Sequence, residues 1–316
     1  MTVAFLCPGQ GAQSPGFLHR LPDHPAVAAT IAETSEALDE DVLGFDREDA
    51  LRSTVAVQLS TVIAGVAAAR VLAANGVGPA AVAGMSVGAF TAAVVCRALS
   101  LPDAVRLVRL RARLMEQAFP QGYGMAAVVG LDERRLRALI GQVHSMATPV
   151  FLANLNAPTQ YVAAGSAEGL DRLVALAQAA GARKAERLAV AVPSHCPLLA
   201  GPAHALAQAI AEIGIAVPGP PYVTNRGARV TRDPQRIADD LACSLMHPVR
   251  WHECTEILYE GGTRLFIELP PGSVLADLAA QALPDARAVT ADGTPAAALA
   301  ALASQIGNTA YKYGIR

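Results

Sequence analysis

Apolar positions along the chain follow two spacings, and each spacing predicts a kind of element. Short apolar runs bounded by glycine or proline predict buried strands at 3–6, 80–84, 222–224 and 264–268. Apolar residues that recur every three or four positions predict helices at 25–38, 55–74, 89–98 and 102–119. Strands and helices that alternate in this way are typical of an α/β fold with a largely parallel sheet.

The middle of the chain has shorter elements in a different order. We expect strands at 126–130, 150–154, 160–165 and 185–190, with helices at 132–143 and 167–180. This βαββαβ order is that of a ferredoxin-like unit. The sequence therefore predicts a ferredoxin-like inserted domain at 125–190 and a large domain formed by 1–124 and 191–316. The last residues, 308–316, are expected to be a frayed tail.

Composition and charge narrow the class of protein. With 53% hydrophobic and 16% charged residues the chain must fold, and 25 basic against 27 acidic side chains argue against nucleic acid as a partner. Residues 71–96 carry no charge, but Asn, Gly and Pro break them into pieces too short to span a membrane. Five cysteines without a CxxC pair suggest neither disulfides nor a metal site, and no secretory signal is visible. We expect a cytoplasmic protein.

A GxSxG sequence, Gly84-Met85-Ser86-Val87-Gly88, lies between a predicted strand and a predicted helix. Strand-to-helix context is what a nucleophile elbow requires, because it exposes the serine while the Val87 N–H faces an oxyanion. The alternative is a glycine-rich turn with a capping serine. Ser86 is the candidate nucleophile.

A serine nucleophile needs a base, and His195 is the candidate among seven histidines. Pro193 and Pro197 bracket it where the chain returns from the small domain to the large one, which suits a fixed general base. A structural histidine held by hydrogen bonds would have the same surroundings. Cys196 next to it is expected to be a small buried residue rather than a nucleophile.

Arg111 lies in the middle of the apolar face of the helix at 102–119. A guanidinium is costly to bury unless it pairs with an anion, and no acidic residue of the same helix shares its face. Either it pairs with a distant acid such as Glu268, or it awaits a carboxylate on the substrate. Three further arginines, Arg106, Arg109 and Arg113, project from the opposite side and are expected to attract anionic partners.

Taken together, these motifs resemble the malonyl-CoA:acyl-carrier-protein transacylases over essentially the whole chain. Pro8-Gly9-Gln10-Gly11-Ala12-Gln13 resembles the family's PGQGxQ motif, whose first glutamine supplies an oxyanion N–H, here Gln10. The resemblance implies that Ser86 is acylated, that His195 is the catalytic base and that Arg111 binds the malonyl carboxylate. It also implies a polar site position at Asn154 and a backbone carbonyl at Ser244 that holds the histidine. The implied fold is an α/β-hydrolase-like domain with a ferredoxin-like insertion.

Some positions depart from the pattern of the fatty-acid-synthesis members. Met85 and Ala89 replace histidine and glutamate at the elbow, Ser244 stands where glutamine is commoner, and Pro270 replaces a glycine near the expected site. These departures resemble the epsilon subunit of bacterial malonate decarboxylase, which is similar to the transacylases. Met85 is accordingly expected to contact the substrate.

The resemblance implies transfer of malonyl from malonyl-CoA, through Ser86, to the thiol of an acyl-carrier protein. The implied acceptor arm is a phosphoribosyl-dephospho-CoA group on the decarboxylase carrier, or phosphopantetheine in fatty-acid or polyketide synthesis. No permanently bound cofactor and no metal are expected. The rival hypotheses are a serine thioesterase or esterase, which shares GxSxG, and a catalytically inert docking subunit.

Overall fold

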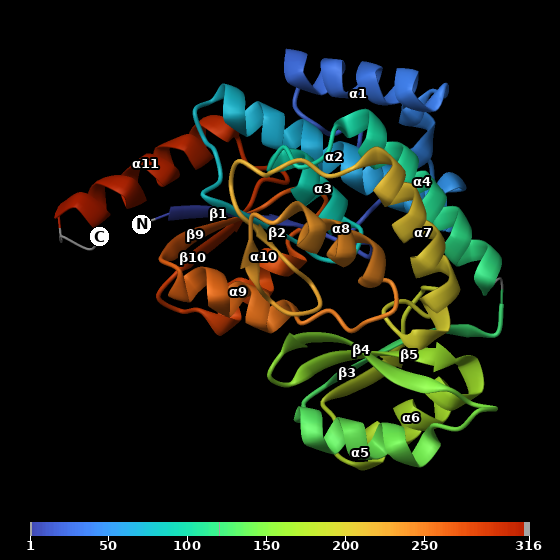
Figure 1. Ribbon diagram of the computed structural model, residues 1–316. Coiled ribbons are helices and arrows are strands. Elements are labelled where there is room, and N and C mark those ends of the chain that lie inside the picture. Colours follow the sequence, from blue (N-terminus) through green and yellow to red (C-terminus); the bar gives the residue numbers. More distant parts are fainter. Residues whose placement is uncertain (1, 120, 313–316) are drawn as a thin grey trace.

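The computed structural model describes residues 2–119 and 121–312, with side chains as far as residue 306, and it contains two sheets (Figure 1). The larger sheet has the strand order β10-β9-β1-β2-β7-β8, and its neighbouring strands run parallel except for β7 and β8. Its strands are β1 (Thr2–Cys7), β2 (Ala81–Gly84), β7 (Tyr222–Val223), β8 (Val230–Thr231), β9 (Thr263–Glu268) and β10 (Arg287–Thr290). This confirms the expected α/β class.

Helices cover both faces of this sheet, because side chains of successive strand residues point to opposite faces. Phe5 and Cys7 of β1 pack into one core, which also takes side chains from α2, α3 and α4, whereas Ala4 and Leu6 pack into another against α9 and α10. The helices of this part are α1 (Pro25–Leu38), α2 (Thr54–Ala74), α3 (Gly88–Val95), α4 (Leu101–Ala118), α7 (Ala200–Ile213), α8 (Pro234–Cys243), α9 (Trp251–Glu260), α10 (Val274–Ala282) and α11 (Ala296–Lys312). Short 3₁₀ turns at Val42–Asp46, Ala50–Arg52 and Pro197–Leu199 connect them.

The uncharged residues 71–96, expected to fold as short buried elements, form the end of α2, the strand β2 and the helix α3. α2 is long and apolar enough to cross a membrane, but it is mostly buried and packs against α1, α3 and α4, as a core helix does. Residues 308–312, where a frayed tail is expected, form the last turn of α11, and their fraying stays a prediction. Residues 313–316 lie outside the described part of the chain.

The smaller sheet has the strand order β4-β5-β3-β6 and is antiparallel throughout. Its elements follow the predicted βαββαβ order: β3 (Tyr123–Val129), α5 (Glu133–Val143), β4 (Val150–Ala157), β5 (Gln160–Ser166), α6 (Ala167–Ala179) and β6 (Lys184–Arg187). The helices α5 and α6 cover one face (Figure 1). The ferredoxin-like fold of this segment is therefore confirmed, while the domain limits at residues 125 and 190 stay a prediction.

The backbone of β4 joins the small sheet to the large part of the chain, at the segment between α8 and α9. Leu155 N donates to Val249 O at 2.8 Å, and Val249 N donates to Ala153 O at 2.9 Å. Asn154 thereby forms a parallel bridge with Val249, in the segment between α8 and α9. Side chains from the uncovered face of the small sheet, such as Met125 and Val162, pack with Cys196 of the large part.

Candidate active site

Ser86 lies at the carboxyl end of β2, immediately before α3. Its φ of 56° is in the left-handed region that non-glycine residues rarely adopt, as a sharp strand-to-helix turn requires. Both glycines of the motif are sterically necessary. A Cβ on Gly84 would lie 2.1 Å from Gly88 O, and one on Gly88 would lie 2.1 Å from Cys7 O. The absence of these side chains lets the turn close tightly against the loop that follows β1.

His195 lies against Ser86 although 109 residues separate them. Its Nε2 is 2.9 Å from Ser86 Oγ, and its Nδ1 is 2.6 Å from the backbone carbonyl oxygen of Ser244. Because a carbonyl only accepts, Nδ1 carries the proton and Nε2 is left to accept from the serine hydroxyl. Burial, together with the positive charge of Arg111, lowers the pKa of His195 to about 4. The histidine is therefore neutral at physiological pH and able to take a proton.

Arg111 reaches the same serine from α4. Its Nη2 donates to Ser86 Oγ at 3.1 Å and its Nη1 donates to Gln58 Oε1 at 2.5 Å, while Nε is buried without an acceptor. Among the described residues no acidic side chain forms an ion pair with it. Burial lowers its pKa to about 9, still above neutral pH, so this cation lies in the interior with neutral partners only.

Glu268, the alternative partner of Arg111, is occupied elsewhere. Its Oε2 accepts a hydrogen bond from Ala276 N at 2.7 Å in the first turn of α10. Burial raises the pKa of this carboxyl to about 7. The ion pair between Arg111 and Glu268 is therefore not formed. The other hypothesis from the sequence is that Arg111 binds a carboxylate of the substrate.

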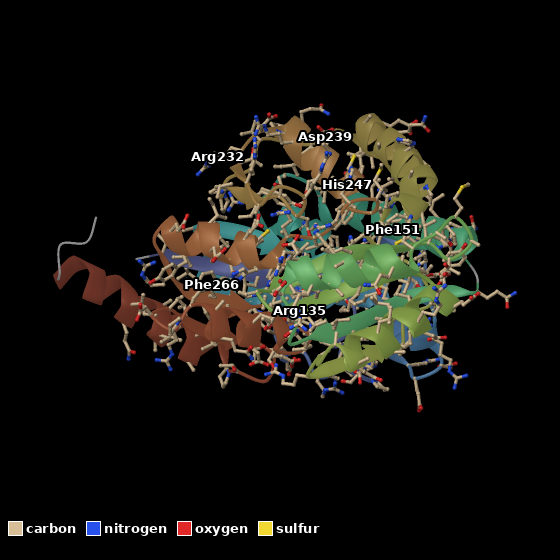
Figure 2. The ribbon with its side chains drawn as sticks, turned by 90° about the horizontal axis from the view of Figure 1, so that it is seen from below. Arg135, Phe151, Arg232, Asp239, His247 and Phe266 are labelled. Carbon is tan, nitrogen blue, oxygen red and sulfur yellow. The ribbon has the colours of Figure 1, made fainter. Side chains whose placement is uncertain are left out.

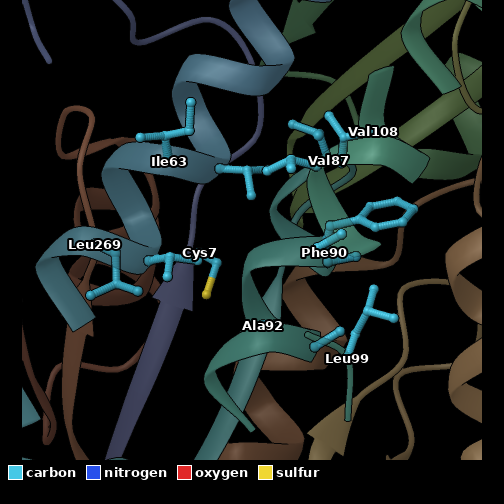
Figure 3. Packing of buried hydrophobic residues seen from close by; sticks show 14 of the residues in the cluster. Cys7, Ile63, Val87, Phe90, Ala92, Leu99, Val108 and Leu269 are labelled. Atoms are coloured by element: carbon cyan, nitrogen blue, oxygen red, sulfur yellow. The ribbon is translucent and has the colours of Figure 1, made fainter. Parts of the chain in front are cut away.

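The two expected oxyanion donors come from neighbouring strand ends. Gln10 lies in the loop after β1 and lines the cavity at Ser86, while Val87 follows the serine in the elbow. The Val87 side chain is buried with Ile63 and Val108 in the core under α2 and α4 (Figure 3). The Val87 side chain therefore packs away from Ser86, and an oxyanion role for this residue would belong to its backbone N–H; unlike Gln10, Val87 is not among the residues that line the cavity.

A cavity of about 240 Å³ opens on Ser86 and His195 between the two sheets. Met85 and Asn154 line it, and their contact with a substrate stays a prediction. Asn156, which the sequence did not single out, also lines it, and its Oδ1 is buried with no donor among the described residues. Pro270 does not line this cavity. It lines a separate cavity with Phe17 and Leu299, and its expected place near the site stays a prediction.

Two further contacts were missed from the sequence. Gln58, a buried polar residue of the otherwise apolar helix α2, accepts from Arg111, and its polarity within that run was the available signal. Asn225, just after β7, accepts a hydrogen bond from Ser86 N through its Oδ1 at 3.1 Å. The sequence feature that could have indicated Asn225 is its position just after a predicted strand, because the carboxyl ends of parallel strands lie along one edge of the sheet.

The arginines on the far side of α4 are not equally accessible. Arg106 and Arg113 are exposed, although Arg106 lies 3.5 Å from Asp103. Arg109 is half-buried and donates to Glu40 at 2.8 Å and to the Leu38 carbonyl at 3.2 Å. The expectation that all three project freely is therefore wrong for Arg109.

A serine at a strand-to-helix turn, with a neutral histidine on its hydroxyl and an α/β sheet beneath it, is an arrangement typical of enzymes that transfer acyl groups. Residues 4–309 match the acyl transferase domain, and the chain belongs to that family.

Relatives and solved structures agree with this assignment. The chain is 37% identical to the malonyl CoA-acyl carrier protein transacylases of Salmonella typhimurium and Escherichia coli over 310 residues, covering 95% of this chain and 98% of each relative. The acyl-carrier-protein S-malonyltransferase of Burkholderia pseudomallei superposes with a TM-score of 0.90 at 35% identity, covering 96% and 99% of the two chains. A malonyl-transacylase in complex with a type II polyketide acyl-carrier protein gives 0.90 at 33% identity, covering 95% and 99%.

Proposed function

We propose that this acyltransferase moves a malonyl group from malonyl-CoA to the thiol of an acyl-carrier protein, through an ester on Ser86. The observation that carries this proposal is Arg111, a buried cation 3.1 Å from Ser86 Oγ that lacks a carboxylate partner among the described residues. An acyl group that ends in a carboxylate can pair with it, because a guanidinium binds carboxylates in a planar, bidentate geometry. The names of the relatives support the same substrate class.

In the first half of the proposed cycle the thioester is broken. His195 Nε2 takes the proton of Ser86 Oγ, and the oxygen attacks the malonyl carbonyl carbon. The backbone N–H groups of Gln10 and Val87 stabilise the oxyanion, each contributing about 3 kcal/mol if they act as such donors do in other enzymes. When the tetrahedral intermediate collapses, the C–S bond breaks, the CoA sulfur takes the proton from His195, and CoA leaves.

The second half repeats these steps with the carrier thiol as nucleophile. His195 removes the thiol proton, the sulfur attacks the ester carbon, and Ser86 Oγ leaves with the proton that His195 returns. The Ser244 carbonyl replaces an acidic third residue, because its hydrogen bond to Nδ1–H keeps Nε2 directed at the serine in both halves. Neither half requires a metal or a resident cofactor, and a cytoplasmic location stays a prediction.

The lowered pKa of His195 predicts an unusual pH profile. Acylation needs the neutral imidazole, so kcat/KM for malonyl-CoA should stay constant from neutral pH down to about 5 and fall with a midpoint near 4. Protonation is disfavoured in the folded state, so this histidine stabilises the fold above its ordinary pKa and that contribution is lost as the pH falls. Single-turnover labelling, with circular dichroism at each pH to check folding, measures the midpoint. A midpoint at the ordinary value of 6.5 would contradict the assignment.

A more specific carrier is a second candidate, because of Met85. This residue lines the cavity next to Ser86 where the fatty-acid-synthesis pattern has histidine. We propose that the altered elbow favours a carrier with a phosphoribosyl-dephospho-CoA arm, as in malonate decarboxylase. The names of the relatives favour the broader alternative, a transacylase that serves an ordinary acyl-carrier protein. The two alternatives predict different acceptors for one reaction.

A competition between two carriers tests both levels of the proposal. The protein is mixed with malonyl-CoA and equal concentrations of two purified carriers, one bearing each arm, and both products and free malonate are quantified by mass spectrometry. Malonylation of either carrier, with little free malonate, is the expected result for a transferase. Malonate alone would indicate a thioesterase.

The ratio of the two products then decides the carrier. A several-fold preference for the phosphoribosyl-dephospho-CoA arm is expected, and rates should fall as salt rises because the longer arm is more anionic. Equal or faster malonylation of the phosphopantetheine carrier would overturn the decarboxylase assignment and leave the general transacylase function standing. Arg113→Ala, which removes an exposed positive charge, should weaken the salt dependence.

A further inference from the structure

The position of the Ser86 backbone is determined by a buried polar network behind it. Ser86 N donates to Asn225 Oδ1 at 3.1 Å, and Asn225 is 1% exposed. The backbone of Ser86 is in the left-handed region, so the turn needs contacts that hold it there. A hydrogen bond to its own N–H is one such contact.

The orientation of the Asn225 amide follows from its second partner. Its Nδ2 donates to Asp240 Oδ2 at 3.1 Å, and Asp240 is 4% exposed. A backbone N–H only donates and a carboxylate only accepts, so the amide must place Oδ1 toward Ser86 and Nδ2 toward Asp240. No other side chain of this size supplies both an acceptor and a donor in that arrangement.

Asp240 is held in turn by several donors. Its carboxylate accepts from Tyr222 Oη at 2.7 Å, from Asn225 N at 2.8 Å and from Arg226 N at 3.2 Å, besides the amide of Asn225. These bonds connect α8 to the end of β7, next to β2 in the sheet. They fix the segment that carries Asn225 against the elbow.

The same helix also holds His195. Ser244 N donates to Asp240 O at 3.0 Å at the end of α8, and the Ser244 carbonyl accepts from His195 Nδ1. The Asp240 side chain is therefore connected to the Ser86 backbone through Asn225. Its main chain is connected to His195 through Ser244. Asp240 thus helps to hold both Ser86 and His195 in place.

We propose that Asn225 and Asp240 are positioning residues that set the Ser86–His195 distance for acyl transfer. This inference rests on the proposed function. Neither residue touches the substrate, so their loss should lower kcat while the KM for malonyl-CoA, which depends on Arg111 and the cavity, changes little. A residue needed only for stability would lower the melting temperature without changing the rate of the folded protein.

The test measures the single-turnover rate of Ser86 malonylation by intact mass, per mole of folded protein. Asn225→Ala should acylate 10- to 100-fold more slowly, with KM within about twofold of the wild type and an unchanged acid limb of the pH profile. Asp240→Asn should also slow the reaction, because its amide nitrogen would face the amide nitrogen of Asn225. The matched control is Asp239→Asn, the neighbouring carboxylate, which is exposed near the edge of the molecule (Figure 2).

A reciprocal exchange distinguishes positioning from general damage. In N225D/D240N the new carboxylate can accept from both Ser86 N and the new amide nitrogen, so the bond between the two side chains is restored. The Tyr222 hydroxyl, which donates to Asp240 Oδ2 in the wild type, can turn to accept from that amide. We expect the double variant to acylate at least fivefold faster than N225D alone. This comparison also decides the question if Asn225→Ala does not fold.

The outcomes separate this inference from the proposed function. A wild-type protein that malonyl-CoA never labels would refute the function itself. If the wild type is labelled but Asn225→Ala reacts at the same rate, or the exchange gives no recovery over N225D, the positioning role is overturned. Slower acylation with an unchanged KM, and recovery in the double variant, supports it.

Discussion

Ser86→Ala is expected to abolish the mass increase of one malonyl group after incubation with malonyl-CoA, and to lower transfer to a carrier by at least about 10³-fold. The substitution removes the oxygen that bonds both His195 Nε2 and Arg111 Nη2, and an alanine methyl cannot attack a carbonyl. The fold should be retained because the elbow is held by its glycines and by its backbone. Intact-mass analysis and circular dichroism measure the two effects.

Cys196→Ala is the control for this experiment. Burial raises the pKa of the Cys196 thiol to about 12, so little thiolate is present at neutral pH. The variant should become labelled like the wild type. A label that persists in Ser86→Ala, or that peptide mapping places on Cys196, would show that the nucleophile is assigned wrongly.

Arg111→Ala is expected to discriminate between acyl groups. Malonyl transfer should fall by roughly 30- to 1,000-fold, because removal of one partner from a buried charge pair costs about 2–4 kcal/mol. Acetyl transfer should change by less than about tenfold, since acetyl has no carboxylate for the guanidinium. The measurement is the acylation rate of Ser86 with malonyl-CoA and with acetyl-CoA.

Arg113→Ala is the matched control, because this arginine lies on the same helix with its side chain exposed. It should leave the ratio of malonyl to acetyl acylation unchanged. If Arg111→Ala instead reduces both rates equally and lowers the melting temperature strongly, Arg111 serves the structure rather than the substrate.

Much of the fold was predictable because its signals are local. Hydrophobic spacing located the strands of the small sheet, the strands β1, β2, β7 and β9 of the large sheet and the helices α1 to α6 to within a few residues, and the βαββαβ order identified the ferredoxin-like unit. The strands β8 and β10 and the helices α7 to α11 were not located. The largest errors lie where local signals are weak. The predicted strand at 185–190 ends at Arg187, and α11 continues past Gly307 and Asn308, residue types that often end helices, into the expected tail.

The candidate site, like the fold, was predictable from the sequence only in part. The sequence by itself predicted the elbow, because GxSxG lies between a predicted strand and a predicted helix, whereas the collisions that a Cβ on Gly84 or Gly88 would make are visible only in the structure. It also indicated an anionic partner for Arg111, because a guanidinium is costly to bury on an apolar helix face, whereas its hydrogen-bond partners in the structure are the neutral Gln58 and Ser86. Which anion it would pair with could not be determined, since Glu268 was an equally good partner on the sequence alone.

Only the tertiary structure decided the contacts between distant segments. Ser86 N and Asn225 Oδ1 are 139 residues apart, and Arg111 and Gln58 are 53 apart, so their pairing depends on how the strands and helices pack. The bond to His195 comes from a main-chain carbonyl, a group that every residue has, and only the resemblance to a family pointed to Ser244. Spacing along a chain determines local conformation, whereas the donor that meets a given acceptor is determined by the packing of whole elements.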